Sequence, residues 1–190
     1  MKILEKICFI LLLTTFSSVY GGSCWDDKDV DDCRVKAEQG DSKSQLMLGG
    51  MYQFGQGVSQ DYKEAVKWSR LAAEQGVPEA QRMLGMMYYH GQGVIQDYKE
   101  SIKWFTKSAE QGDSKSQYNL GEIYQEGKGV PKNKVMAYMF FNLAAVNGNE
   151  VNIKSRNKVA NNMTSSQLEK SQDMALEWIR SHKQIEESYF

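Results

Sequence analysis

A block of about 36 residues is repeated three times in this chain, over residues 41–76, 77–112 and 113–148. The first two copies agree at more than half of their aligned positions and share the runs GQGV, QDYKE and AEQG, whereas the third copy is looser. Each unit of such an array buries its apolar face only against its neighbours, so the repetition predicts a solenoid. Solenoids usually offer a long surface to a partner and seldom carry out chemistry.

Each copy is expected to form two antiparallel helices. In the first copy, Asp41 is a suitable N-cap for the first helix, and Gly55 is suited to a left-handed C-cap. The second helix should begin at Asp61, with Glu64 three residues later as in a capping box, and end before Gly76. The fold class that follows is all-α, a right-handed α/α superhelix of helix-turn-helix repeats with capping helices at both ends.

Glycine recurs at one register inside the first helices, where it costs about 1 kcal/mol relative to alanine. These residues are Gly49, Gly85 and Gly121. Their recurrence predicts a close approach between helices, and we expect small residues of the second helices as the partners, namely Ala73, Ala109 and Ala145. Trp68 and Trp104 also recur at one register and are expected in the core.

The array is expected to have caps. Residues 22–40 contain a lone helix of the second type, because CRVKAEQG at Cys33 aligns with SRLAAEQG before Gly76. Residues 149–182 should supply two closing helices, the second opened by a capping box between Thr164 and Gln167. Residues 183–190 are polar and are expected to fray.

Residues 1–21 have the pattern of a secretory signal peptide, with a basic start, a short apolar run and small residues up to Gly21. The apolar run is too short to span a membrane, and an uncleaved anchor is the alternative. Cleavage would leave a chain without a membrane-inserted segment, in the periplasm or secreted. That compartment is oxidising.

Loss of the signal peptide removes Cys8 and leaves Cys24 and Cys33, an even pair that suggests a disulfide. Nine residues of continuous helix would separate them by about 13.5 Å, so the chain at Cys24 must fold back for the bond to form. The alternative is a lipoprotein with Cys24 acylated, which leaves Cys33 unpaired.

Charge and composition favour a protein partner over other classes. The net charge of −1 gives no basic field for nucleic acid or anionic lipid. The only histidines, His90 and His182, have no further ligand nearby in sequence, so no metal is expected. Ser155 and Lys158 match S-x-x-K without the S-D-N and K-T-G that accompany it in β-lactamases. We therefore assign no catalytic residue, no enzyme activity and no cofactor.

The period, the G-x-G-V turn, the A-E-Q-G ending and the L-G-x-x-Y core at Leu48 resemble the Sel1-like repeat (SLR) family, relatives of the tetratricopeptide repeats. The resemblance covers residues 33–148. Copy three departs from the pattern, with PKNK at Pro131 in place of QDYK and Phe140 in place of tryptophan. The resemblance implies an adaptor whose first helices line a concave face.

Exported bacterial members of this family include envelope regulators, host-interaction proteins and immunity proteins that neutralise toxins. A cysteine-rich branch binds or hydrolyses β-lactams, and it carries a cysteine pair in every repeat. The repeats of this chain contain no cysteine. The absence of these cysteines favours a protein-binding monomer, and a weak β-lactam or cell-wall hydrolase is the alternative that the resemblance leaves open.

The candidate binding residues are those that differ between copies on the first helices, because packing does not dictate them. They combine aromatic, thioether, cationic and acidic side chains, several of them types enriched at interface centres. The set comprises Arg82, Met86, Tyr89, His90, Phe54, Tyr118 and Glu122. The alternative is that these positions simply tolerate variation.

Overall fold

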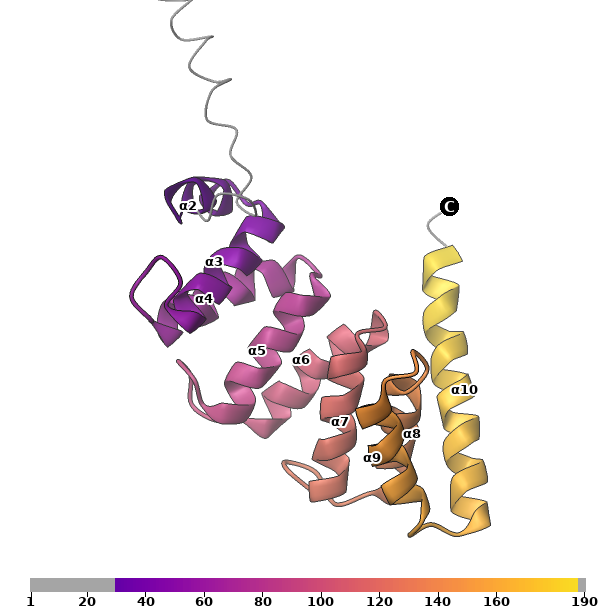
Figure 1. The fold of residues 1–190 in the computed structure, drawn as a ribbon. Coiled ribbons are helices and arrows are strands. Elements are labelled where there is room, and N and C mark those ends of the chain that lie inside the picture. Colours follow the sequence, from indigo (N-terminus) through magenta and orange to yellow (C-terminus); the bar gives the residue numbers. More distant parts are fainter. Residues whose placement is uncertain (1–29, 188–190) are drawn as a thin grey trace, which may run out of the picture.

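The computed structural model describes the backbone of residues 30–187 and the side chains of residues 30–182. Within this range the chain forms helices joined by short turns (Figure 1). The helices are α2 (Val30–Glu38), α3 (Ser42–Phe54), α4 (Tyr62–Glu74), α5 (Pro78–His90), α6 (Tyr98–Glu110), α7 (Ser114–Glu126), α8 (Lys134–Ala144), α9 (Glu150–Ala160) and α10 (Ser165–Glu187). The predicted signal peptide lies outside the described residues.

The helices α3 to α8 form three hairpins that follow one another along an arc (Figure 1). We call α3, α5, α7 and α9 the first helices, and α2, α4, α6 and α8 the second helices. Neighbouring first helices touch: Met86 Sδ lies 3.7 Å from Asn119 Nδ2, and Tyr118 Oη lies 3.5 Å from Ser155 Oγ. The expected all-α solenoid is confirmed.

The predicted helix ends are confirmed at the residues that cap them. The carboxylate of Asp41 accepts a hydrogen bond from the Ser44 amide, and Gly55 ends α3 with φ +66°. Asp61 caps α4 in the same way by accepting from the Lys63 and Glu64 amides. The second half of the expected capping box is not formed, because the Glu64 carboxylate instead accepts from Nε1 of Trp68 at 3.1 Å.

The recurring glycines do mark close contacts, but their partners differ from those expected. A Cβ atom on Gly85 would lie 2.8 Å from the ring of Phe105, and one on Gly121 would lie 2.7 Å from Phe141. At Gly49 the nearest atom is Oγ of Ser69, at 2.7 Å. The small residues that we expected, Ala73, Ala109 and Ala145, are buried one helical turn further on. The glycines therefore make room for whole side chains.

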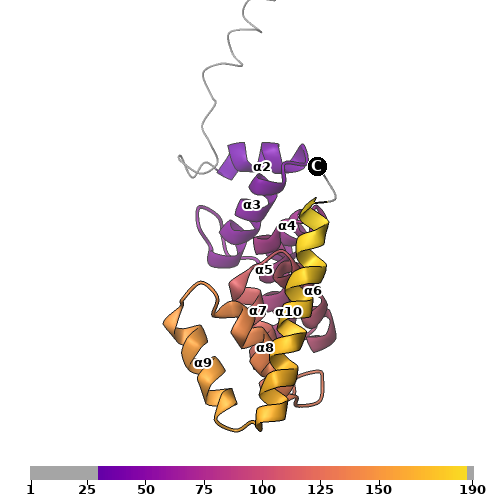
Figure 2. The same ribbon diagram turned by 90° about the vertical axis from the view of Figure 1, so that its right-hand side faces the viewer.

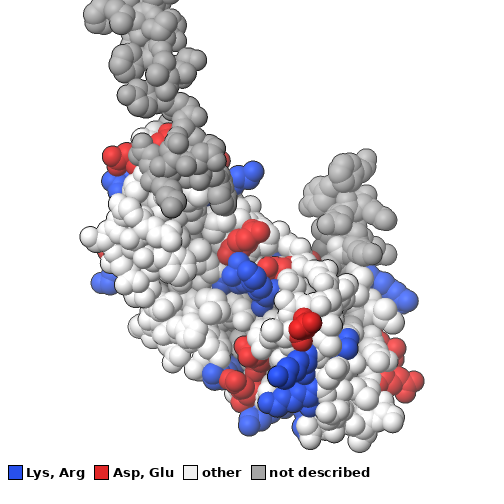
Figure 3. All heavy atoms as spheres, in the orientation of Figure 1, with Lys and Arg blue, Asp and Glu red and all other residues white. Residues whose placement is uncertain are grey.

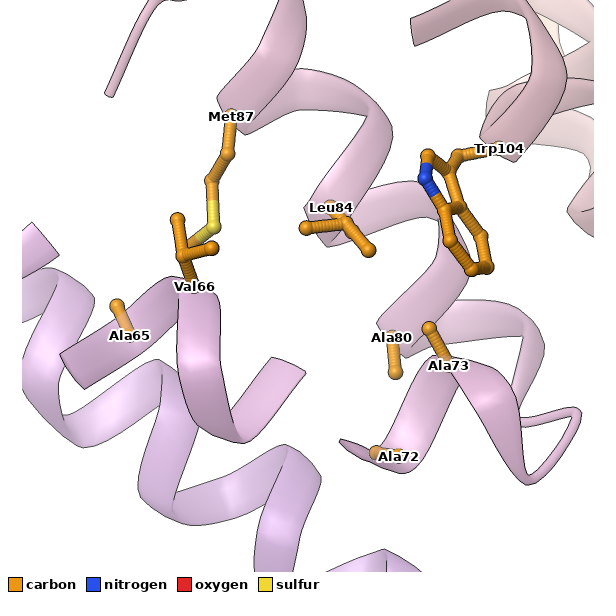
Figure 4. Packing of buried hydrophobic residues seen from close by; sticks show 8 residues of the cluster. All are labelled: Ala65, Val66, Ala72, Ala73, Ala80, Leu84, Met87 and Trp104. Atoms are coloured by element: carbon orange, nitrogen blue, oxygen red, sulfur yellow. The ribbon is translucent and has the colours of Figure 1, made fainter. Parts of the chain in front are cut away.

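The core consists of the faces that adjacent hairpins turn toward each other. In Figure 4, Leu84 of α5 lies between Met87, which points at Val66 of α4, and the indole of Trp104. Leu84 and Met87 are fully buried, and Trp104 is 5% exposed. Trp68 is 7% exposed in the neighbouring cluster, so the prediction that both tryptophans are core residues is confirmed.

One hydrogen bond ties each first helix to the end of the second helix before it. A buried amide side chain in the first turn donates to a backbone carbonyl eight residues earlier. The pairs are Gln45 to Ala37 at 3.0 Å, Gln81 to Ala73 at 3.1 Å, Gln117 to Ala109 at 3.3 Å and Asn152 to Ala144 at 2.7 Å. The fourth pair shows that α9 continues the series of first helices.

The two ends of the array differ. At the N-terminal end, α2 packs on α3, and Cys33 of α2 is disulfide-bonded. Its predicted partner Cys24 lies outside the described residues, so that pairing stays a prediction. At the other end, α10 packs mainly on α8, and α9 and α10 diverge from the turn that joins them (Figure 2).

The start of α10 has the expected capping box, with the Thr164 amide donating to Gln167 at 3.0 Å and the Gln167 amide donating to Thr164 at 3.2 Å. The helix then runs to Glu187, beyond residue 182, where we expected the cap to end.

Candidate partner-binding surface

Four of the predicted binding residues lie around one small pocket between two first helices. Met86, Tyr89 and His90 come from α5, and Glu122 comes from α7. The pocket has a volume of about 140 Å³, and Phe105 and Asn119 complete its lining. We call it the α5–α7 pocket. Sequence comparison between copies thus selected residues that the fold brings together.

Tyr89 is the most constrained side chain of this pocket. Nζ of Lys128, from the third G-x-G-V turn, donates to the Tyr89 hydroxyl at 2.6 Å and lies 4.8 Å from the ring centroid. The rings of His90 and Tyr89 form a T-shaped pair with a centroid distance of 4.9 Å. The hydrogen bond to Glu126, and next the one to Tyr89, raises the pKa of Lys128 above its ordinary value. Lys128 therefore stays cationic beside the pocket.

Glu122 is a half-buried carboxylate at the edge of the same pocket. Burial raises its pKa above the ordinary value of 4.5, and the hydrogen bond from Tyr118 at 3.2 Å partly opposes that effect. The ring of Tyr118 lies against Phe141 of α8, with centroids 5.3 Å apart. Tyr118 does not line the pocket, but it orients the carboxylate that does.

Two of the predicted residues lie apart from the pocket. Arg82 forms an ion pair with Asp113, with Nε 3.1 Å from Oδ2, and both side chains are largely buried. Asp113 also caps α7 by accepting from the Ser116 amide. Arg82 thus ties the second repeat to the third. Phe54, at the end of α3, is 66% exposed and does not contact the pocket.

Figure 3 shows charges of both signs interspersed over the lower right part of the molecule, with a largely uncharged area in the middle of the left side. No single sign covers this view. This face therefore carries no dominant positive field of the kind that a polyanion requires.

Comparison with known protein families identifies the repeats. The Sel1 repeat profile matches residues 42–77, 78–113 and 114–149. The chain belongs to the Sel1 repeat family. Sel1 repeats are protein–protein interaction modules, and their fold is a non-enzymatic scaffold.

Two solved Sel1-type structures are similar to this chain. A Sel1 repeat protein from Oxalobacter formigenes is 39% identical over 69% of this chain and 98% of its own, with a TM-score of 0.61. A protective antigen present in uropathogenic Escherichia coli strains, which displays an SLR fold, is 29% identical. That match covers 85% of this chain but only 43% of the antigen, with a TM-score of 0.62. No curated protein matches the chain.

The Sel1 array also forms a larger cleft that sequence reasoning missed. It lies between α10 and the turns that join second helices to the next first helices, and its volume is about 810 Å³. Trp178, Ile179 and His182 of α10 form one wall, and Gln81 and Gln117 of the repeats lie on the other. Nε2 of His182 is 3.6 Å from Oε1 of Glu110 in α6. We call this the C-terminal cleft.

One signal in the sequence pointed to the cleft. AEQG ends the first two repeats, but the third ends in Asn147-Gly148, so the last glutamine of the series is replaced by asparagine. Trp178 gave no such signal, because a tryptophan outside the repeats has no equivalent with which to compare it.

The part of the chain that the structure describes contains no group of three or more histidine, cysteine, aspartate or glutamate side chains placed to hold a metal. Among the described helices, none is both long enough and apolar enough to cross a membrane.

Proposed function

We propose that this Sel1 protein is exported and binds another protein through its first helices, with the α5–α7 pocket at the centre of the interface. The observation that carries the proposal is the convergence of Met86, Tyr89, His90 and Glu122 on one pocket, although each differs from its equivalents in the other copies. A patch dictated by packing would repeat with the period of the array.

The chemistry of the pocket supports a protein partner. An aromatic ring, a thioether and a carboxylate line the pocket, and Nζ of Lys128 lies over the Tyr89 ring. Aromatic residues and methionine are enriched at interface centres, and flexible thioethers adapt to different partners. The ring of Tyr89 is already fixed by Lys128, so an interface would lose little side-chain entropy in using it.

Export is supported by the pattern of residues 1–21 and by the likeness to a protein described as a protective antigen. A disulfide at Cys33 also suits the periplasm or the outside of the cell. Within this reading the protein acts as a monomeric adaptor, an envelope regulator or an immunity protein that neutralises a toxin.

The test begins with capture of the partner from envelope extracts on the mature chain, residues 22–190, followed by calorimetry with the purified partner. Tyr89→Ala and Met86→Ala should each weaken binding by at least about 1 kcal/mol, the usual threshold for a residue that matters at an interface. The matched controls are Lys63→Ala and Lys99→Ala, which change exposed residues of the second helices. If the lysine variants abolish binding and the pocket variants do not, the partner uses another face.

Arg82→Ala is compared with the pocket variants, because it should affect stability. Its removal leaves Asp113 without its ion-pair partner, so we expect a lower melting temperature. By contrast, Tyr89→Ala and Met86→Ala should change binding more than stability.

A further inference from the structure

The C-terminal cleft lies where a regular series of side-chain hydrogen bonds stops. In the first repeat, Nε2 of Gln75 donates to Oε1 of Gln45 at 2.7 Å. In the second, Nε2 of Gln111 donates to Oε1 of Gln81 at 2.8 Å. Each bond joins the last turn of a repeat to the first helix of the same repeat, and each satisfies the glutamine oxygen on that helix.

The third repeat lacks this bond. Asn147 occupies the register of Gln75 and Gln111, its side chain is one methylene shorter, and it makes no hydrogen bond to Gln117. The Oε1 atom of Gln117 consequently accepts no hydrogen bond within the described chain, although the residue is only 7% exposed. This oxygen is not among the fully enclosed unsatisfied atoms of the described residues, so it keeps access to the solvent.

Gln117 lines the C-terminal cleft. The residues around its free acceptor are suited to a polypeptide segment, because they combine apolar and charged side chains. Leu143, Trp178 and Ile179 provide an apolar wall on the α8 and α10 side. Lys107 and Glu110 line the same cleft with opposite charges, and Nε2 of His182 lies 3.6 Å from the Glu110 carboxylate. A volume of about 810 Å³ falls within the roughly 300–1,000 Å³ of sites that enclose a whole ligand.

We propose that the C-terminal cleft binds an extended segment of a partner protein. A backbone N–H of that segment donates to Oε1 of Gln117 and takes the place of the missing glutamine amide. A neighbouring apolar side chain of the segment packs against Trp178 and Ile179. The mixed charges of the rim argue against a nucleic acid or an anionic lipid surface, which require one dominant positive field.

This site is separate from the α5–α7 pocket, with which it shares no lining residue. Binding at the C-terminal cleft and binding at the α5–α7 pocket can therefore be tested independently, and either proposal can fail while the other holds.

The variant that tests the proposal is Asn147→Gln, which restores the glutamine at the register of Gln75 and Gln111. Asn147 is exposed, so the longer side chain has room. The side-chain amide of the new glutamine is expected to donate a hydrogen bond to Oε1 of Gln117, so that this oxygen is no longer available to a ligand. The melting temperature should stay the same or rise, which separates loss of binding from loss of fold.

The probe is a phage-displayed library of short random peptides, selected on the mature wild-type chain and counter-selected on Asn147→Gln. Peptides synthesised from the selected clones should bind the wild type and lose about two- to tenfold in affinity toward Asn147→Gln, as expected for one hydrogen bond. Tyr89→Ala should bind them with unchanged affinity.

An ester analogue identifies the bond itself. Replacing the amide that donates to Gln117 by an ester removes its N–H and should weaken binding to the wild type by the same factor. The ester should cause no further loss in Asn147→Gln, because the two changes remove one interaction.

The proposal is overturned if the selection yields no peptide, if the peptides bind wild type and Asn147→Gln equally well, or if Tyr89→Ala abolishes their binding. Self-association of the wild-type chain that disappears in Asn147→Gln, measured by sedimentation, would assign the cleft to a second copy of this chain instead.

Discussion

At its N-terminal end the array closes with a helix that continues the repeat, whereas at its C-terminal end the last helix leaves the repeat register. Helix α2 receives the Gln45 amide on its Ala37 carbonyl, as later second helices do. Arg34 of α2 donates to the Tyr52 hydroxyl at 3.2 Å, and one unit later Arg70 donates to Tyr88 at 2.6 Å. Helix α10, in contrast, packs mainly on α8 and does not continue the series of hairpins.

The contrast relates capping to function. A cap that copies the repeat satisfies the same polar groups and fills the same contacts as another unit would. At the other end the third repeat itself departs from the pattern at Asn147, and the cap α10 then packs on α8 outside the repeat register. In this molecule the open acceptor on Gln117 and the C-terminal cleft both lie at the irregular end. Both proposed binding surfaces thus lie where the sequence departs from its period.

The largest expected effect compares a tryptophan of each region. Trp104→Ala should lower the free energy of unfolding by about 3–5 kcal/mol, because the ring is 5% exposed within the repeat core. Trp178→Ala should cost only about 1–2 kcal/mol, because half-buried area contributes less on transfer from water. Urea denaturation followed by circular dichroism measures both values. Equal losses would show that α10 is as integral to the core as the repeats.

A smaller effect compares two glycines of the first helices. Gly121→Ala should destabilise by about 1–3 kcal/mol, because its Cβ would lie 2.7 Å from the Phe141 ring. Gly50→Ala should stabilise by about 0.5–1 kcal/mol, since its Cβ would meet only the Met83 methyl at 3.9 Å and the helix gains propensity. The opposite signs can be read from melting temperatures. If Gly121→Ala stabilises the protein, the Phe141 ring moves aside for the added Cβ atom at little cost.

The smallest effect depends on pH. Burial raises the pKa of Glu122, so at neutral pH the folded state holds a charged carboxylate that is better solvated in the unfolded chain. Glu122→Gln should therefore raise the melting temperature slightly at neutral pH. The gain should vanish as pH falls below 4.5, where Glu122 is protonated in both states. A gain that persists at acidic pH would assign the effect to the Tyr118 hydrogen bond instead.

Local patterns predicted much of the fold. The capping residues Asp41 and Asp61, the C-cap Gly55 and the buried Trp68 follow from helix chemistry and period, so comparison of copies was enough to place them. The binding candidates were placed by the opposite reasoning, since positions that break the period gathered at the α5–α7 pocket.

Contacts between distant parts of the chain could not be predicted in this way. The ion pair between Arg82 and Asp113 was not predicted, because the sequence gives no sign that these two residues of neighbouring units meet. The glycine partners were missed because Phe105 and Phe141 are bulky, and only the structure shows glycine accommodating a ring. The course of α10 depends on its packing against α8, for which the repeats offer no template.

The hydrogen bond from each first helix to the carbonyl of the preceding unit has a consequence for how such chains change in length. Its donor and acceptor lie on either side of a unit boundary and recur at every boundary. If residues 77–112 were deleted, Gln117 would follow Ala73 at the spacing at which it now follows Ala109, and the bond would form across the new junction. Gene duplication or loss could therefore add or remove whole units while the fold persists. Such a deletion would remove the proposed binding site, because Met86, Tyr89 and His90 all belong to the deleted unit.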